Sequence, residues 1–139
     1  MMKRGSLAIW LVAVIGLIWN GMGLANFAGQ IFGDLTGSMP DSHRAIIETR
    51  PFWATAGFGV GVLTGVIGAL LLAMRNPTAV PIFVVSLVAM IIQSIHTARI
   101  GMTRDALGGA ELVMYLMMPL IGAVFLLWFA RMCRRRNWF

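Results

Sequence analysis

The sequence predicts an all-α fold, an integral membrane four-helix bundle that forms a single transmembrane domain over residues 1–139. Hydrophobic residues make up 59% of the chain and charged residues only 12%, whereas about a quarter of the residues in ordinary soluble domains are charged. The mean hydropathy is +0.84. Four apolar runs, each near the roughly 20 residues needed to cross a bilayer as a helix, account for most of the chain.

The first predicted helix covers about residues 7–32 and follows Lys3 and Arg4. A positive start before an apolar stretch is also typical of a secretory signal peptide, for which residues 23–25 would be a candidate cleavage site. Because the apolar run continues past that site, we expect an uncleaved helix. The stretch from 33 to 50 contains Gly-Asp, Gly-Ser and Pro-Asp pairs, which favour a solvent-exposed loop.

The second predicted helix covers residues 52–74 and starts after Pro51, a residue that suits the first turn because its missing N–H would be unpaired there. A short connection around Arg75 leads to the third helix, residues 78–97, so these two helices are expected to be antiparallel neighbours. After a polar stretch, the fourth helix is predicted at residues 110–130.

The distribution of charge predicts a topology with both termini in the cytoplasm (N-in/C-in). Under this topology all five acids lie outside and most of the 11 positive residues lie inside, as the positive-inside rule requires. The net charge of +6 is therefore an orientation signal rather than a sign of nucleic-acid binding. The positive residues assigned to the inside are Lys3, Arg4, Arg75, Arg131, Arg134, Arg135 and Arg136.

A glycine zipper on the second predicted helix is the strongest packing signal. Gly57, Gly61 and Gly65 are four residues apart and therefore share one helix face. Small residues allow a second backbone to approach closely, where dispersion contacts replace the hydrophobic effect that lipid does not supply. The partner could be a helix of the same chain or of another copy.

Four polar side chains are the candidate substrate-binding residues. Asn20 and Gln30 belong to the first predicted helix, Gln93 to the third and Tyr115 to the fourth. An amide in hydrocarbon needs a hydrogen-bond partner, because an unpaired polar group there is costly. Two interpretations of Asn20 remain open: a hydrogen bond that joins two helices, or a contact with a ligand.

The depth of the polar residues predicts a vestibule. At about 1.5 Å of rise per residue, Gln93, Glu111 and Tyr115 lie on the outer halves of their helices, as does Gln30. We expect a polar vestibule open to the outside and closed by an apolar plug on the cytoplasmic side. The alternative is that these residues only reach the headgroup water from helix ends.

His96 and Glu111 form a possible proton relay, since such a pair can titrate near neutral pH. The alternative for His96 is an exposed histidine at a helix end. A haem or metal site between His43 and His96 is disfavoured, because His43 falls in the expected loop and no ligand spacing supports the pair. The sequence shows no nucleophile elbow, phosphate loop or metal-ligand run. We therefore expect no catalytic residues, no enzyme activity, no metal and no cofactor.

Four segments of the first three predicted helices resemble those of a known family. They are Leu17-Ile18-Trp19-Asn20-Gly21-Met22-Gly23, Pro51-Phe52-Trp53-Ala54-Thr55, Leu70-Leu71-Leu72 with Arg75, and Phe83 to Gln93 with Ser86-Leu87. In these segments the chain resembles small four-helix bacterial inner-membrane proteins that are uncharacterised and often loosely labelled "sugar transporter". The resemblance implies a multi-pass protein of the bacterial inner membrane, without implying any substrate residues.

Two functions are compatible with these observations. The first is a transporter-like protein that moves a small neutral polar solute such as a sugar. A neutral solute is favoured because the first predicted helix holds amides and no acid. The alternative is a non-transporting accessory or assembly subunit that docks on a larger membrane complex through the glycine-rich second helix. The expected partners are the lipid bilayer and either further copies of the chain, as a homo-oligomer, or a larger membrane complex, with no nucleic acid.

Overall fold

The computed structural model describes residues 5–33, 41–103 and 109–139. The side chains of 42, 43, 45, 46 and 101–103 are outside that description. The described chain is all-α, as predicted. Its helices are α1 (Ser6–Phe32), α2 (Asp41–Glu48), α3 (Phe52–Ala73), α4 (Ala79–Thr103) and α5 (Gly109–Arg135).

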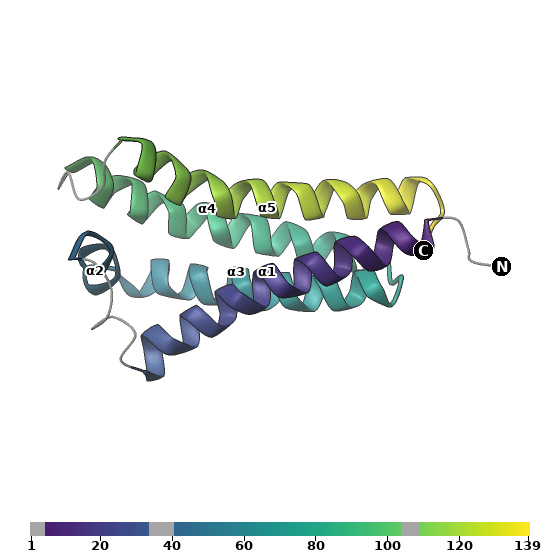
Figure 1. Ribbon diagram of the computed structural model, residues 1–139, viewed down its shortest axis with the longest axis horizontal. Coiled ribbons are helices and arrows are strands. Elements are labelled where there is room, and N and C mark those ends of the chain that lie inside the picture. Colours follow the sequence, from purple (N-terminus) through teal and green to yellow (C-terminus); the bar gives the residue numbers. More distant parts are fainter. Residues whose placement is uncertain (1–4, 34–40, 104–108) are drawn as a thin grey trace.

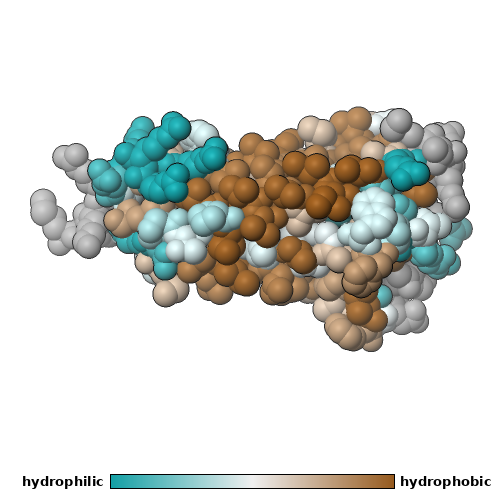
Figure 2. Space-filling model, turned by 180° about the vertical axis from the view of Figure 1, so that it is seen from behind, coloured by the Kyte–Doolittle hydropathy of each residue, from teal (hydrophilic) through white to brown (hydrophobic). Residues whose placement is uncertain are grey.

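Four of the described helices, α1, α3, α4 and α5, are long and apolar enough to cross a membrane. Figure 2 shows an apolar band across the middle of the molecule with hydrophilic surface at both ends. This distribution is compatible with an integral, multi-pass membrane protein. The orientation with both termini in the cytoplasm stays a prediction.

The four long helices lie side by side in one bundle (Figure 1). α3 packs between α1 and α4, and α4 packs between α3 and α5, whereas α1 and α5 make little contact. The first residues of α1, the turn from α3 to α4 and the last residues of α5 lie at one end, which we call the terminal end. α2 lies at the opposite end, the α2 end, where α1 diverges from α5.

The structure corrects one boundary prediction and extends two others. Residues 41–48 form α2, where the sequence predicted only a loop. Asp41 lies in its first turn, where a carboxylate is stabilised by the helix dipole, and Arg44 forms an ion pair with it (3.6 Å, Nη1 to Oδ1). α4 and α5 continue beyond the predicted ends to Thr103 and Arg135. An apolar run marks only the part of a helix in contact with lipid, and the backbone hydrogen bonds continue beyond it.

The apolar core of the bundle lies at the terminal end. Phe83 of α4, which is 1% exposed, is the largest of the fully buried side chains. Small residues such as Ala13 and Ala130 let the helices approach closely around it. We call the buried cluster the terminal core; its members are Ile9, Ala13, Ala69, Leu72, Ala79, Val80, Phe83, Leu126, Phe129, Ala130 and Cys133.

The C-terminal residues close the terminal end of the bundle. Arg75, in the turn between α3 and α4, has a positive φ of 57°, and its Nη1 donates a hydrogen bond to the carbonyl oxygen of Trp138 (2.9 Å). The ring of Trp138 lies against Gly5, whose positive φ of 75° is a backbone conformation that favours glycine. A side chain at Gly5 would overlap that indole. These contacts tie three distant segments together.

The glycine face of α3 packs within the chain itself. A methyl group at Gly57 would lie 3.1 Å from the carbonyl oxygen of Ala89 in α4, and one at Gly61 would lie 3.0 Å from Cε of Met90. Gly65 faces the Asn20 side chain of α1. All three glycines are buried. Their partner helices therefore belong to the same chain and not to another copy. An accessory subunit could not dock through this face without opening the bundle.

A hydrogen bond joins α3 and α4 at this contact. The Ser86 hydroxyl donates to the carbonyl oxygen of Gly61 (2.7 Å) and is buried. We expect Ser86→Ala to lower the free energy of unfolding by about 0.6 to 1.7 kcal/mol, the range for polar contacts between membrane helices. Thr64→Val is the matched control, because the Thr64 hydroxyl bonds within its own helix. Equal losses in reversible unfolding in detergent would contradict the interhelical role of Ser86.

Candidate functional site

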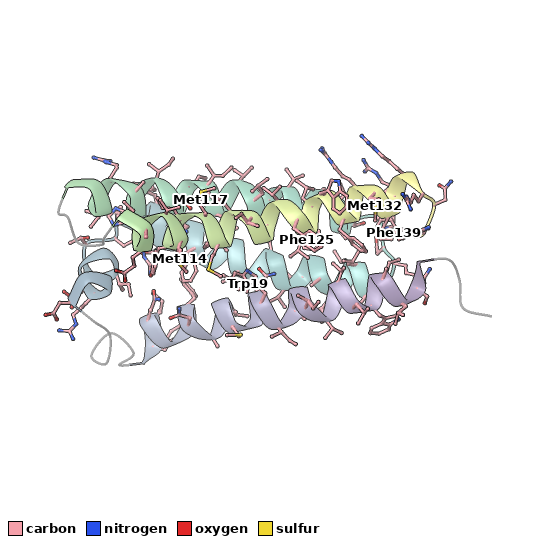
Figure 3. The ribbon with its side chains drawn as sticks, turned by 45° about the horizontal axis from the view of Figure 1, so that its top comes forward. Trp19, Met114, Met117, Phe125, Met132 and Phe139 are labelled. Carbon is pink, nitrogen blue, oxygen red and sulfur yellow. The ribbon has the colours of Figure 1, made fainter. Side chains whose placement is uncertain are left out.

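A pocket of about 610 Å³ lies at the α2 end of the bundle. It is lined by residues from all five helices or their ends, with Val62, Met90 and Thr97 from α3 and α4 buried at its floor. Residues of α1 and α5 form the two rims, and there Met22 is 67% exposed and Met114 61%. Figure 3 shows Trp19 and Met114 in the space between α1 and α5. The pocket is therefore a groove that opens between these two helices. Its polar lining residues are Asn20, Asn26, Arg50, Gln93, Thr97, Glu111 and Tyr115.

Each long helix divides between the pocket and the terminal core at the same level. The part toward the α2 end lines the pocket and the part toward the termini is apolar and buried. Polar lining residues and an apolar core are separated along the bundle, as a vestibule and a plug would be, although the walls of the pocket are less polar than expected. That the pocket end faces the outside stays a prediction. The pocket takes residues 19–26, 58–62, 90–97 and 111–119, and the terminal core takes residues 9–13, 69–72, 79–83 and 126–133.

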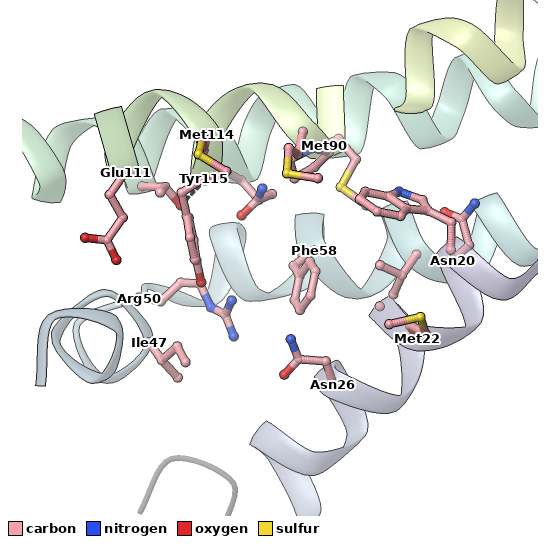
Figure 4. A pocket seen from close by; sticks show the side chains of 17 residues that line it. Asn20, Met22, Asn26, Ile47, Arg50, Phe58, Met90, Glu111, Met114 and Tyr115 are labelled. Atoms are coloured by element: carbon pink, nitrogen blue, oxygen red, sulfur yellow. Dashed lines mark hydrogen bonds between the residues drawn. The ribbon is translucent and has the colours of Figure 1, made fainter. Parts of the chain in front are cut away.

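Arg50, between α2 and α3, is the most distinctive group in the pocket. Its Nη2 donates a hydrogen bond to Oε1 of Gln30 (2.7 Å), and its Nε donates to Oγ1 of Thr55 (3.2 Å). The guanidinium also lies 5.3 Å from the centre of the Phe58 ring. Burial lowers the pKa of Arg50 from its usual range, and the nearby Tyr115 partly opposes this shift. Figure 4 shows the Tyr115 ring pointing from α5 toward this guanidinium.

The structure brings three of the four predicted substrate residues to the pocket lining: Asn20, Gln93 and Tyr115. Gln30 is not among the residues that line it. Its Nε2 donates to Oδ1 of Asn26 (3.0 Å), while its Oε1 accepts from Arg50. Both ends of the Gln30 amide therefore bond within the chain, and Gln30 acts by holding Arg50 in position rather than by facing the pocket.

Asn20 lies where the pocket meets the terminal core and is 5% exposed. Its Nδ2 donates to the carbonyl oxygen of Gly16 in its own helix (2.9 Å). Its contact with another helix is steric, because its amide fits against Gly65 of α3. The predicted hydrogen bond between helices is thus replaced by a bond within α1 and close packing across α3.

His96 and Glu111 lie in different surroundings. His96 is 6% exposed and its ring packs edge-on against Trp53 (centroids 6.2 Å apart). The alternative of an exposed histidine at a helix end is therefore wrong, since α4 continues past this residue and α3 covers it. Glu111 is exposed at the rim of the pocket. His96 is not among the described residues that line this pocket. The proton relay stays a prediction.

The sequence reasoning missed Arg50 and Thr97 as lining residues of the pocket, whereas Asn26 belongs to the polar residues on the outer half of the first helix from which the vestibule was predicted. In the predicted topology Arg50 is one of the positive residues that fall on the outer side, and it has no other predicted role. Its position directly before Pro51 and the start of a span was the signal that could have found it, because a charge at that place is held at the edge of the bundle. His43 as a metal ligand falls outside the described side chains. In the described residues no group of three or more His, Cys, Asp or Glu side chains could hold a metal ion.

Comparison with protein-family models, curated proteins and solved structures gave no match. The predicted resemblance to small inner-membrane proteins therefore stays a prediction. The fold and the pocket define the class of protein: a bundle of four membrane-type helices with a pocket at one end and an apolar core at the other.

Proposed function

We propose that the chain is a transporter-like membrane protein that binds a small solute in the pocket at the α2 end and passes it across the bilayer. The observation that carries the proposal is the division of the bundle into an open pocket and a closed terminal core. A pocket of about 610 Å³ is within the size range of small-molecule sites, and polar groups among apolar walls are typical of such sites.

The polar groups that line the pocket have different roles in binding a solute. The Gln93 amide, the Tyr115 hydroxyl and the Asn26 amide can hydrogen-bond a solute, while Arg50 and Glu111 provide one charge of each sign. Passage would require α1 and α5 to close over the pocket and the terminal core to open. Pro119 lines the pocket within α5 and lacks the N–H that would bond to the preceding turn, so a bend of α5 is least costly there.

The remaining features of the proposal follow from the sequence. We place the protein in the bacterial inner membrane with both termini in the cytoplasm and the α2 end outside. A homo-oligomer fits the small size of one bundle. We prefer transport to the accessory role, because the glycine face assigned to docking is covered by α1 and α4.

A blocking experiment tests the proposal without disturbing the fold. Met22→Cys places a thiol on the exposed rim, and the native thiol, Cys133, is buried at the other end. In reconstituted vesicles screened with labelled solutes, we expect a bulky maleimide on Met22→Cys to reduce uptake at least tenfold relative to the unlabelled variant.

The matched control is Met117→Cys, which is also exposed but lies on α5 outside the pocket lining. Its labelling should leave uptake unchanged. Transport should be rejected if wild-type vesicles accumulate none of the tested solutes above empty vesicles, or if both labelled variants behave alike.

A further inference from the structure

We propose that the pocket accepts an anionic amphiphile, a single-tailed molecule with a carboxylate or phosphate head, that reaches it sideways from the bilayer between α1 and α5. This inference rests on the proposed function, since it names the class of solute for the same pocket. It replaces the neutral sugar that the sequence alone favoured.

The head of the ligand is assigned by Arg50. The groups against its guanidinium in the described part of the chain carry no charge: the Gln30 amide oxygen, the Thr55 hydroxyl and the Phe58 ring. The nearby Tyr115 is a phenol, which is also uncharged at neutral pH. A half-buried charge with neutral partners is poorly compensated, and an anion would compensate it. The fixed fork of a guanidinium matches carboxylate and phosphate oxygens.

The tail of the ligand is assigned by the walls between Arg50 and Asn20. Apolar side chains from three helices line the pocket, including Trp19, Phe58 and Met90. Figure 4 shows Phe58 and Met90 between Arg50 and Asn20. Methionine side chains adapt to irregular apolar shapes. A sugar would leave most of its hydroxyl groups without partners against such walls, whereas an alkyl tail needs none.

The route by which the ligand enters follows from the two rims of the pocket, which belong to α1 and α5. α1 and α5 make little contact and diverge toward the α2 end (Figure 1), and rim residues such as Met22 and Met118 are exposed. In a bilayer this opening faces lipid, because both rims belong to helices that are apolar enough to span it. Glu111 stands at the exposed rim, where water and salt weaken its repulsion of an anion.

The test measures binding of a brominated dodecanoate to the full chain in nanodiscs. Bromine quenches indole fluorescence at short range, so a ligand tail beside Trp19 should give saturable quenching that Trp19→Phe abolishes. Dodecanoate and dodecyl phosphate should compete, whereas dodecanol, which has the same tail without charge, should compete at least tenfold more weakly. Comparison of the two anions identifies the preferred head.

Arg50→Gln should weaken binding about tenfold or more, the loss expected for a hydrogen bond to a charged group. Arg50→Lys, which keeps the charge, should retain part of the affinity. Arg44→Gln is the matched control, since it removes a charge at the same end and outside the pocket lining, and it should leave affinity unchanged.

Two results would overturn the inference. One is equal competition by dodecanol and dodecanoate on the wild-type protein, which needs no variant to fold. The other is unchanged affinity in Arg50→Gln. If either occurs while the label on Met22→Cys still blocks uptake of a neutral solute, only the amphiphile is rejected and transport stands. If that label blocks no uptake, transport is rejected as well.

Discussion

Replacing Phe83 with alanine is expected to lower the free energy of unfolding by about 2 to 3 kcal/mol. Phe83 is 1% exposed in the terminal core, and its ring lies against Gly68 so closely that a methyl group there would be 2.7 Å from it. Truncation of a large side chain in a soluble core costs more, about 3 to 5 kcal/mol. In a bilayer the hydrophobic transfer contributes less because lipid is also apolar, and the loss of dispersion contacts around the cavity remains.

The measurement is reversible unfolding of the purified protein in mixed micelles, followed by loss of helical signal. Phe52→Ala is the matched control, because Phe52 begins α3 and is 86% exposed. It should change stability by less than about 0.5 kcal/mol. If the two variants lost equal stability, Phe83 would not be packed as the structure describes.

Gly65→Leu is expected to be at least as damaging, with a loss of about 3 kcal/mol from overpacking. A side chain at Gly65 would overlap the Asn20 amide, which is held in place by its hydrogen bond to the carbonyl oxygen of Gly16. α1 would therefore have to move away from α3. The same change would deform the inner end of the pocket, so uptake should fall together with stability.

Gly21→Leu is the control for this substitution, because a methyl group added at Gly21 would meet no atom within 4 Å apart from its chain neighbours and the adjacent backbone of α1. Leucine also favours a helix more than glycine does, by somewhat less than about 1 kcal/mol, so stability should be unchanged or raised. A stable, fully active Gly65→Leu protein would show that α1 and α3 do not meet at this glycine.

The order of the helices was readable from the sequence because hydropathy reports where a segment can cross a bilayer. The glycine spacing on α3 predicted a packing face, and Gly57, Gly61 and Gly65 are buried beside residues of α4 and α1. α2 was missed because short polar helices give no hydropathy signal and their first residues are also common in turns. The partner of the glycine face could not be predicted, because spacing along one helix contains no information about which helix faces it.

The candidate site was predictable in part. Gln93 and Tyr115 line the pocket. Their depth could be predicted, because depth along a helix follows from residue count alone. Arg50 was missed because its partners, Gln30 and Thr55, come from two different helices, and only the fold brings them together. The burial of His96 was missed for a related reason: its cover is Trp53 of α3, and the sequence does not show how the two helices are rotated against each other.

The contact of Trp138 with Gly5 and Arg75 has a consequence for biosynthesis. Trp138 is synthesised late and contacts Gly5, which leaves the ribosome much earlier. During translation α1 would wait in the translocon or the lipid with its final neighbours missing, and the closed end would form only after α5 has been inserted. Contacts of such long sequence separation are formed slowly. Variants that destabilise α1 while its final neighbours are still missing should therefore depend most strongly on chaperones or an insertase.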